Sequence, residues 1–121
     1  MIKKMNIYEK AVQGQLDAFN AHDIDEFLKW YTEDYKGFDY NTGEVLFQGK
    51  KVAYERYSNM FKNEILNCKT LNRMVLGRTI IDHEEISKDE SGEKTDVIAI
   101  YEVEESGLIS IVRFIYGNTR R

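Results

Sequence analysis

Two residues of this chain carry side chains that exchange protons and lie where a small pocket is expected. Asp39 ends a segment rich in aromatic residues, and His83 lies in the polar stretch Asp82-His83-Glu84. Aromatic side chains around a carboxylate raise its pKa and suit it to act as a general base. A histidine changes charge near neutral pH. The two residue types predict proton transfer, with Asp39 and His83 as the candidate catalytic groups.

Each of these two residues also has a simpler structural interpretation. Asp39 directly precedes the sequence Tyr40-Asn41-Thr42-Gly43, and an Asp at that position commonly accepts hydrogen bonds from the backbone of a turn. His83 alternates with Asp82 and Glu84, so it shares a strand face with Ile81 and the two acids point the other way. A histidine within a strand is more often partly exposed or paired with a neighbour than catalytic.

Other kinds of chemistry have little support in the sequence. The two histidines and the single Cys68 are scattered, so no pair has the spacing of metal ligands on one element. There is no glycine-rich phosphate loop and no nucleophile elbow. The prediction is a site without a metal or cofactor.

Composition points to one soluble domain spanning residues 1–121. Of the 121 residues, 42% are hydrophobic and 31% charged, with a formal net charge of −4. A negative net charge argues against nucleic-acid binding, which requires clustered Lys and Arg. No apolar run is long enough for a signal peptide or a membrane span. A lone cysteine allows no internal disulfide, and we expect a cytoplasmic protein.

Three helices are expected before the main run of strands. Apolar residues at three-to-four spacing predict a helix over residues 5–21. Asp23 followed by Glu26 forms a capping box for a second helix, whose inner face would include Phe27 and Tyr31. A third helix is predicted from about Lys50 to Asn63.

Most of the remaining sequence alternates with the period of two that is typical of strands. The predicted strands are Cys68–Leu76, Thr79–Ser87, Thr95–Val103 and Leu108–Tyr116, with short strands near Tyr35–Asp39 and Val45–Phe47. Helices followed by antiparallel strands predict an α+β domain, with helices on one face of a curved sheet.

The last two predicted strands are apolar on both faces. A sheet covered by helices on one side only should carry polar residues on the other side. A second copy of the chain is the simplest cover, so we predict a homodimer through this outer face. The predicted interface residues are Ile98, Ile100, Ile111, Arg113 and Ile115.

Several segments together resemble the nuclear transport factor 2-like family, also called cystatin-like or SnoaL-like. They are HDIDEFLKWYTEDY, Asp39, the start of the third helix at Gly49-Lys50-Lys51-Val52, and the terminal pair VIAIYEVEESGLISIVRF. The resemblance implies a cone-shaped, strongly curved mixed or antiparallel sheet with three helices packed on its concave face. It also implies a cavity for a small ligand at the mouth of the cone and a dimer through the outer sheet face.

Within this family, the steroid isomerases resemble the chain only in part. Their proton-shuttling Asp corresponds to Asp39, and their pocket tyrosines correspond to Tyr31 and Tyr57. Their two oxyanion donors correspond to Gln15 and Ala99, and Ala99 has no donor. Because losing one such donor typically costs about a hundredfold or more in rate, the resemblance implies an inefficient steroid isomerase at best.

The sequence leaves three functions open. The first is an acid–base isomerase or dehydratase acting on a small apolar ligand, the second is a ligand-binding or sensing module without turnover, and the third is a dimerisation domain whose own side chains fill the cavity. The residues expected to line the pocket are Gln15, Tyr31, Tyr57, Ala99, Tyr101, Val112, Phe114 and Tyr116. For the aromatic residues among them, simple core packing is the stronger alternative.

Overall fold

The computed structural model describes residues 5–120 of the chain. The helices are α1 (Ile7–Asn20), α2 (Ile24–Leu28) and α3 (Lys50–Met60). The strands are β1 (Tyr31–Asp39), β2 (Val45–Gln48), β3 (Asn67–Leu76), β4 (Thr79–Ser87), β5 (Lys94–Val103) and β6 (Ile109–Arg120).

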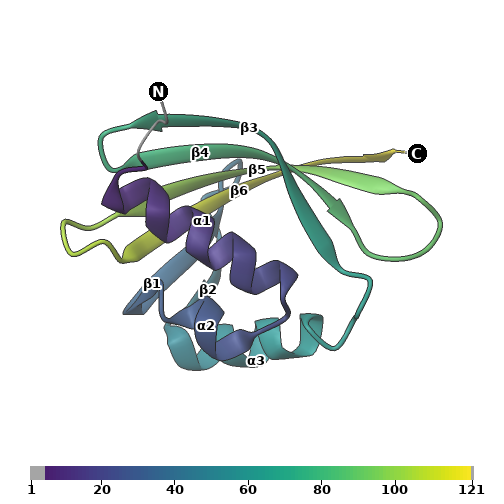
Figure 1. Ribbon diagram of the computed structural model, residues 1–121, viewed down its shortest axis with the longest axis horizontal. Helices are drawn as coiled ribbons and strands as arrows, with labels where there is room; N and C mark the ends of the chain where they lie inside the picture. Colours follow the sequence, from purple (N-terminus) through teal and green to yellow (C-terminus); the bar gives the residue numbers. More distant parts are fainter. Residues whose placement is uncertain (1–4, 121) are drawn as a thin grey trace.

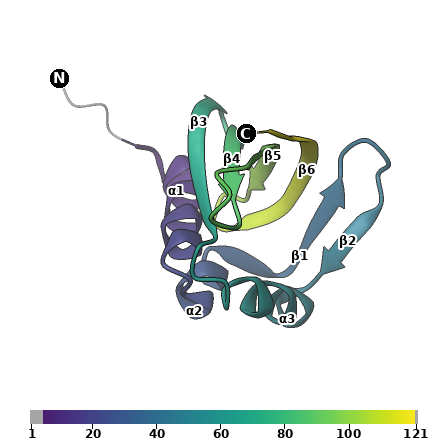
Figure 2. The same cartoon turned by 90° about the vertical axis from the view of Figure 1, so that its right-hand side faces the viewer.

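The strands form a six-stranded mixed sheet in the order β2-β1-β6-β5-β4-β3. Only β1 and β6 pair in parallel, and the other neighbours are antiparallel. Figures 1 and 2 show that the sheet bends strongly and is not closed, with the helices on its inner side. This is the predicted α+β architecture with a curved sheet over three helices, and that prediction is confirmed.

Local capping explains where the first two helices begin. The Asn6 side chain accepts a hydrogen bond of 2.8 Å from the Glu9 amide at the start of α1, and the Asp23 side chain accepts one of 3.2 Å from the Glu26 amide at the start of α2. Each bond satisfies an amide that the helix itself leaves without a partner. The predicted cap at Asp23 is therefore confirmed.

A cluster of aromatic side chains holds the helices to the start of β1. The ring of Phe27 in α2 lies 6.2 Å from Phe19, 5.1 Å from Tyr31, 4.7 Å from Tyr57 and 5.5 Å from Phe61, measured between centroids. These rings come from α1, β1, α3 and the residue that follows α3. Because aromatic pairs add stabilisation to the area that they bury, this cluster fixes the three helices relative to the sheet.

Helix α1 approaches the start of β1 through a glycine. A Cβ atom at Gly14 would lie 2.2 Å from the indole of Trp30, well inside contact distance. The half-buried indole therefore occupies the space that a side chain at position 14 would need. Substitution of Gly14 would push α1 away from the core.

The strand bounds agree with the prediction within a few residues, and three features differ from it. Tyr31 begins β1 rather than continuing the inner face of α2. Helix α3 ends at Met60, before the predicted end at Asn63. The parallel pairing of β1 with β6 was not predicted, because periodicity identifies a strand without identifying its neighbour.

The outer face of β5 and β6 is apolar, as its sequence predicts. Ile98 pairs with Ile115 and Ile100 with Arg113 across the two strands, and all four residues are half-buried. Arg113 forms an ion pair with Glu102 of the same chain. Within residues 5–120, no helix has the length and apolar character needed to cross a membrane.

Candidate functional site

A cavity of about 900 Å³ lies between the helices and the inner face of the sheet. Most of its wall is apolar or aromatic. The interior residues are Gln15, Leu16, Phe19, Phe27, Tyr31, Tyr57, Met60, Leu66, Cys68, Glu84, Ile86, Val97, Tyr101 and Phe114. Ligand sites in proteins are commonly concave and apolar with a few polar groups, and this cavity has that character.

The cavity opens to solvent beside α3 and the end of β4. The lining residues on this side are exposed and mostly polar. They are Glu55, Arg56, Asn59, Asn63, Lys88 and Tyr116. An Asn63–Lys88 hydrogen bond of 2.8 Å, from the Asn63 side chain to the Lys88 carbonyl oxygen, holds the two elements together at the opening.

Glu84 is the buried carboxyl group in the lining of this cavity. Glu84 is 4% exposed. Burial is the larger cause and the nearby charge of Asp82 the smaller one, and together they raise the pKa of its carboxyl group to about 8. Hydrogen bonds from Cys68 and Tyr101 and the charge of Arg73 act in the opposite direction. A carboxyl group with this pKa exists in both protonation states near neutral pH, as a general acid or base requires.

A chain of hydrogen bonds leads from the helices to Glu84. The Tyr31 hydroxyl donates to Gln15 Oε1 at 2.8 Å, and Gln15 Nε2 donates to the Tyr101 hydroxyl at 3.1 Å. The Tyr101 hydroxyl in turn interacts with Glu84 and acts to lower the pKa of its carboxyl group. Burial raises the pKa of both tyrosine hydroxyls well above the ordinary value, so they remain neutral donors. This series of hydrogen bonds orients the Tyr101 hydroxyl toward the Glu84 carboxyl group.

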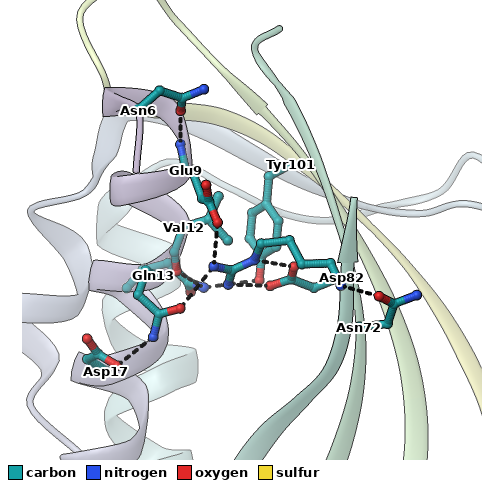
Figure 3. A network of polar contacts seen from close by, with 10 residues as sticks. Asn6, Glu9, Val12, Gln13, Asp17, Asn72, Asp82 and Tyr101 are labelled. Atoms are coloured by element: carbon teal, nitrogen blue, oxygen red, sulfur yellow. Dashed lines mark hydrogen bonds and ion pairs between the residues drawn. The ribbon is translucent and has the colours of Figure 1, made fainter. Parts of the chain in front are cut away.

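An ion-pair network lies beside these hydrogen bonds, between α1 and the strands β3 and β4 (Figure 3). Asp82 is fully buried, and its two oxygens accept hydrogen bonds of 2.7 and 2.9 Å from Arg73. Arg73 also donates to Gln13 Oε1 at 2.9 Å and lies 3.6 Å from the Glu9 carboxylate. The paired guanidinium compensates the buried negative charge next to Glu84.

Six of the eight predicted pocket residues line the cavity. They are Gln15, Tyr31, Tyr57, Tyr101, Phe114 and Tyr116. The other two, Ala99 and Val112, are almost fully buried in the core and are not part of the lining. Ala99 lies directly opposite Asp82 in the β4–β5 register. A carboxylate is therefore present one strand away from Ala99, the position that corresponds to an oxyanion donor in the steroid isomerases.

The two predicted catalytic residues lie outside the lining. Asp39 Oδ1 accepts backbone hydrogen bonds from Asn41 at 2.9 Å and Thr42 at 3.1 Å. This is the simpler structural interpretation of Asp39, in which it caps its own turn. The His83 side chain is 45% exposed, and its Nε2 lies 3.3 Å from Asp96 Oδ1. His83 faces outward while Asp82 and Glu84 face inward, the reverse of the predicted orientation, because Asp82 and Glu84 pair with the buried Ala99 and Val97 of β5.

Glu84 and Arg56 are two charged lining residues that the sequence did not predict. The alternation along β4 groups Asp82 and Glu84 with Ile80 and Ile86, two residues that also pack inward. That grouping was a usable signal, but the sequence shows Ile81 on the other face as well. Arg56 gave no signal, because a single Arg on a helix is ordinary.

Within the part of the chain that the structure describes, no group of three or more His, Cys, Asp or Glu side chains is arranged to hold a metal ion. Cys68 is buried next to Glu84, and burial raises the pKa of its thiol. A thiol in this state is a weak nucleophile.

The comparison with protein families gives a match over most of the chain. The profile of the SnoaL-like domain matches residues 12–112. A comparison with curated proteins gives no sequence match.

Solved structures with the same fold include several proteins of low sequence identity. A cystatin-fold protein from Novosphingobium aromaticivorans superposes with a TM-score of 0.80 at 22% identity, covering 93% of this chain and 99% of its own. A candidate ketosteroid isomerase from Kribbella flavida gives 0.78 at 16% identity, covering 95% and 81%. An NTF2-like protein from Cytophaga hutchinsonii gives 0.75 at 13% identity, covering 97% and 95%. At these identities the likeness establishes the fold.

Proposed function

This chain belongs to the SnoaL-like domain family, and from that premise we propose that it binds a small, largely apolar molecule and transfers protons through Glu84. The observation that carries the proposal is a single buried carboxyl group in the wall of an apolar cavity, with a pKa of about 8. Buried acids with perturbed pKa values in clefts are typical of functional sites.

The proposed reaction begins with the ionised Glu84 carboxylate removing a proton from carbon next to an electron-withdrawing group of the ligand. The proton then has two destinations. It returns to a different carbon in an isomerisation, or it leaves with a hydroxyl group as water in a dehydration. Glu84 acts as base in the first step and as acid in the second, which a pKa near neutral pH favours.

Tyr101 is the positioning group of this proposal. Its hydroxyl interacts with Glu84 and accepts a hydrogen bond from Gln15. A donor held in this way stabilises the carboxylate form and keeps the reacting oxygen pointed into the cavity. The earlier proposal of Asp39 and His83 as catalytic groups has weaker support, because neither side chain contributes to the cavity lining.

A model proton-transfer reaction tests the function without knowledge of the natural substrate. In the ring opening of nitrobenzisoxazole, a base removes a carbon-bound proton, the nitrogen–oxygen bond breaks and a coloured phenolate forms. We expect kcat/KM to rise with pH through about 8 as Glu84 loses its proton. Glu84→Gln should abolish this pH-dependent rate.

Matched controls separate Glu84 from the residues first suggested by the sequence. Asp39→Asn and His83→Gln should retain the wild-type rate, since both side chains lie outside the lining. An unchanged rate in Glu84→Gln would contradict catalysis by Glu84. Binding of the compound by both proteins with no turnover by either would support the ligand-binding alternative. The filled-cavity alternative has no support, because Tyr31, Tyr57, Tyr101 and Phe114 line an open cavity.

We further propose that the protein is a cytoplasmic homodimer through the outer face of β5 and β6. Half-buried isoleucines on this face, at positions 98, 100, 111 and 115, support the dimer. The single buried Cys68 supports a reducing compartment.

A further inference from the structure

Arg56 lies at the mouth of the cavity with its guanidinium held against aromatic rings. Its Cζ lies 5.3 Å from the centroid of the Phe47 ring and 6.0 Å from that of Tyr57. Its charge also acts on the hydroxyls of Tyr57 and Tyr116, two lining residues, and partly offsets the rise in their pKa values. Guanidinium groups stacked on aromatic rings lose little freedom when they bind an anion.

Arg56 differs from Arg73 and Arg113 in lacking an acidic partner among residues 5–119. Arg73 pairs with Asp82, and Arg113 pairs with Glu102. No carboxylate among residues 5–119 forms an ion pair with Arg56, although the chain contains more acidic than basic residues, 21 against 17.

The other charged lining residues set the direction in which an anionic ligand would bind. Lys88 adds a second cation at the mouth. Among the described lining residues, Glu55 is the carboxylate on this side of the cavity. The buried Glu84 and the Asp82 charge behind it make the interior unfavourable for an anion. The polar end of an anionic ligand is therefore stable only at the mouth, and its apolar body would extend inward.

We propose that the natural ligand is an apolar organic acid whose anionic group binds Arg56 at the mouth while its body reaches Glu84. The inference rests on the proposed function only in that both use the same cavity. Arg is suited to this role because its planar donors match a carboxylate in a bidentate arrangement. The proposal therefore narrows the class of ligand from any small apolar molecule to a carboxylate or similar acid.

Binding of two matched probes, naphthoate and the neutral naphthamide, tests the proposal by calorimetry at a pH below the pKa of Glu84. The wild-type protein should bind naphthoate about fivefold more tightly, as expected for an ion pair at a solvent-exposed rim. Arg56→Met should lose this preference and keep its affinity for naphthamide. Lys51→Met is the control, since it removes an equal charge from α3 outside the cavity lining.

A salt titration of the wild-type protein gives a second readout that does not depend on a variant. Naphthoate affinity should fall as KCl concentration rises, and naphthamide affinity should not change. Equal binding of the two probes, or an Arg56→Met variant that keeps the preference, would overturn the anion proposal alone. Failure of the wild-type protein to bind either probe would overturn the binding function as well.

Discussion

Two carboxylates of this chain show how environment, rather than residue type, determines chemistry. Asp39 accepts two backbone hydrogen bonds from its own turn. Glu84 faces an apolar cavity and lies near the second buried acid, Asp82. Burial penalises the charged form of a carboxylate, and a neighbouring negative charge adds to that penalty. Glu84 can therefore change its protonation near neutral pH.

The raised pKa of Glu84 predicts how stability depends on pH. The folded protein holds this proton more tightly than the unfolded chain, whose Glu has a pKa near 4.5. The contribution to stability is fully present below about pH 4.5 and is lost as pH rises to about 8. Glu84→Gln cannot ionise, so its free energy of unfolding should exceed that of the wild type by roughly 3–5 kcal/mol above pH 8.

Urea unfolding of the two proteins across this pH range measures the difference. The comparison removes the contributions of all other titrating groups, which both proteins share. A difference that stays constant between these pH values would show that Glu84 is not the titrating group.

Tyr101 should influence the protonation of Glu84 through its hydroxyl group. That hydroxyl stabilises the carboxylate form and lowers the Glu84 pKa. Tyr101→Phe should therefore raise the Glu84 pKa further and shift the pH profile of the model reaction upward. Tyr31→Phe is the control, because Tyr31 is separated from Glu84 by Gln15 and Tyr101 in the hydrogen-bond chain. Equal profiles for wild type and Tyr101→Phe would contradict this role.

At the scale of elements, the sequence predicts the helices and strands well and the orientation of β4 poorly. Apolar periodicity and the Asp23 cap identify α1 and α2, and alternation identifies the long strands. On β4, apolar residues occur on both faces, at Ile80 and Ile81. Only the pairing with β5, which turns Val97, Ala99 and Tyr101 inward, determines that Glu84 faces the cavity. Long-range pairing is not encoded in local alternation.

The Arg73–Asp82 pair connects α1 with β3 and β4, and its loss should destabilise the whole domain. Arg73→Met leaves a fully buried carboxylate without a partner. We expect the free energy of unfolding to fall by about 3–5 kcal/mol, as is typical when one partner of a buried pair is removed.

The double variant Arg73→Met, Asp82→Leu provides the control. Replacing both charges with apolar side chains removes the unpaired ion, so most of the lost stability should return. Chemical denaturation measures both changes. A single variant as stable as the wild type would show that Asp82 does not need Arg73.

At the scale of the whole molecule, the apolar outer face predicts a dimer. Ile98 and Ile115 are direct neighbours across β5 and β6, so Ile98→Lys would introduce a charge into a two-fold interface beside apolar partners. Sedimentation should show a wild-type dimer and a monomeric variant. Leu76→Lys is the control, because Leu76 is 85% exposed at the end of the edge strand β3. A wild-type monomer at micromolar concentration would contradict the interface.

The cavity itself belongs to this scale and is the part least accessible from sequence. Its walls come from α1, α2, α3 and strands β1, β3, β4, β5 and β6, far apart along the chain. The resemblance to a known family predicted a cavity and pointed to Gln15, Tyr31 and Tyr57, which line it, whereas Tyr101, Phe114 and Tyr116 were predicted from the strands. It did not predict the acid inside, because Glu84 depends on how this particular chain orients β4.

The most direct test of the account is the pKa of Glu84 in the intact protein. Carbon-13 NMR of protein labelled at the glutamate carboxyl carbons follows each group through a pH titration, and the spectrum of Glu84→Gln identifies the Glu84 resonance by its loss. We predict a midpoint near 8. A midpoint at the ordinary value of about 4.5 would contradict the claim that this cavity holds an acid–base group active near neutral pH.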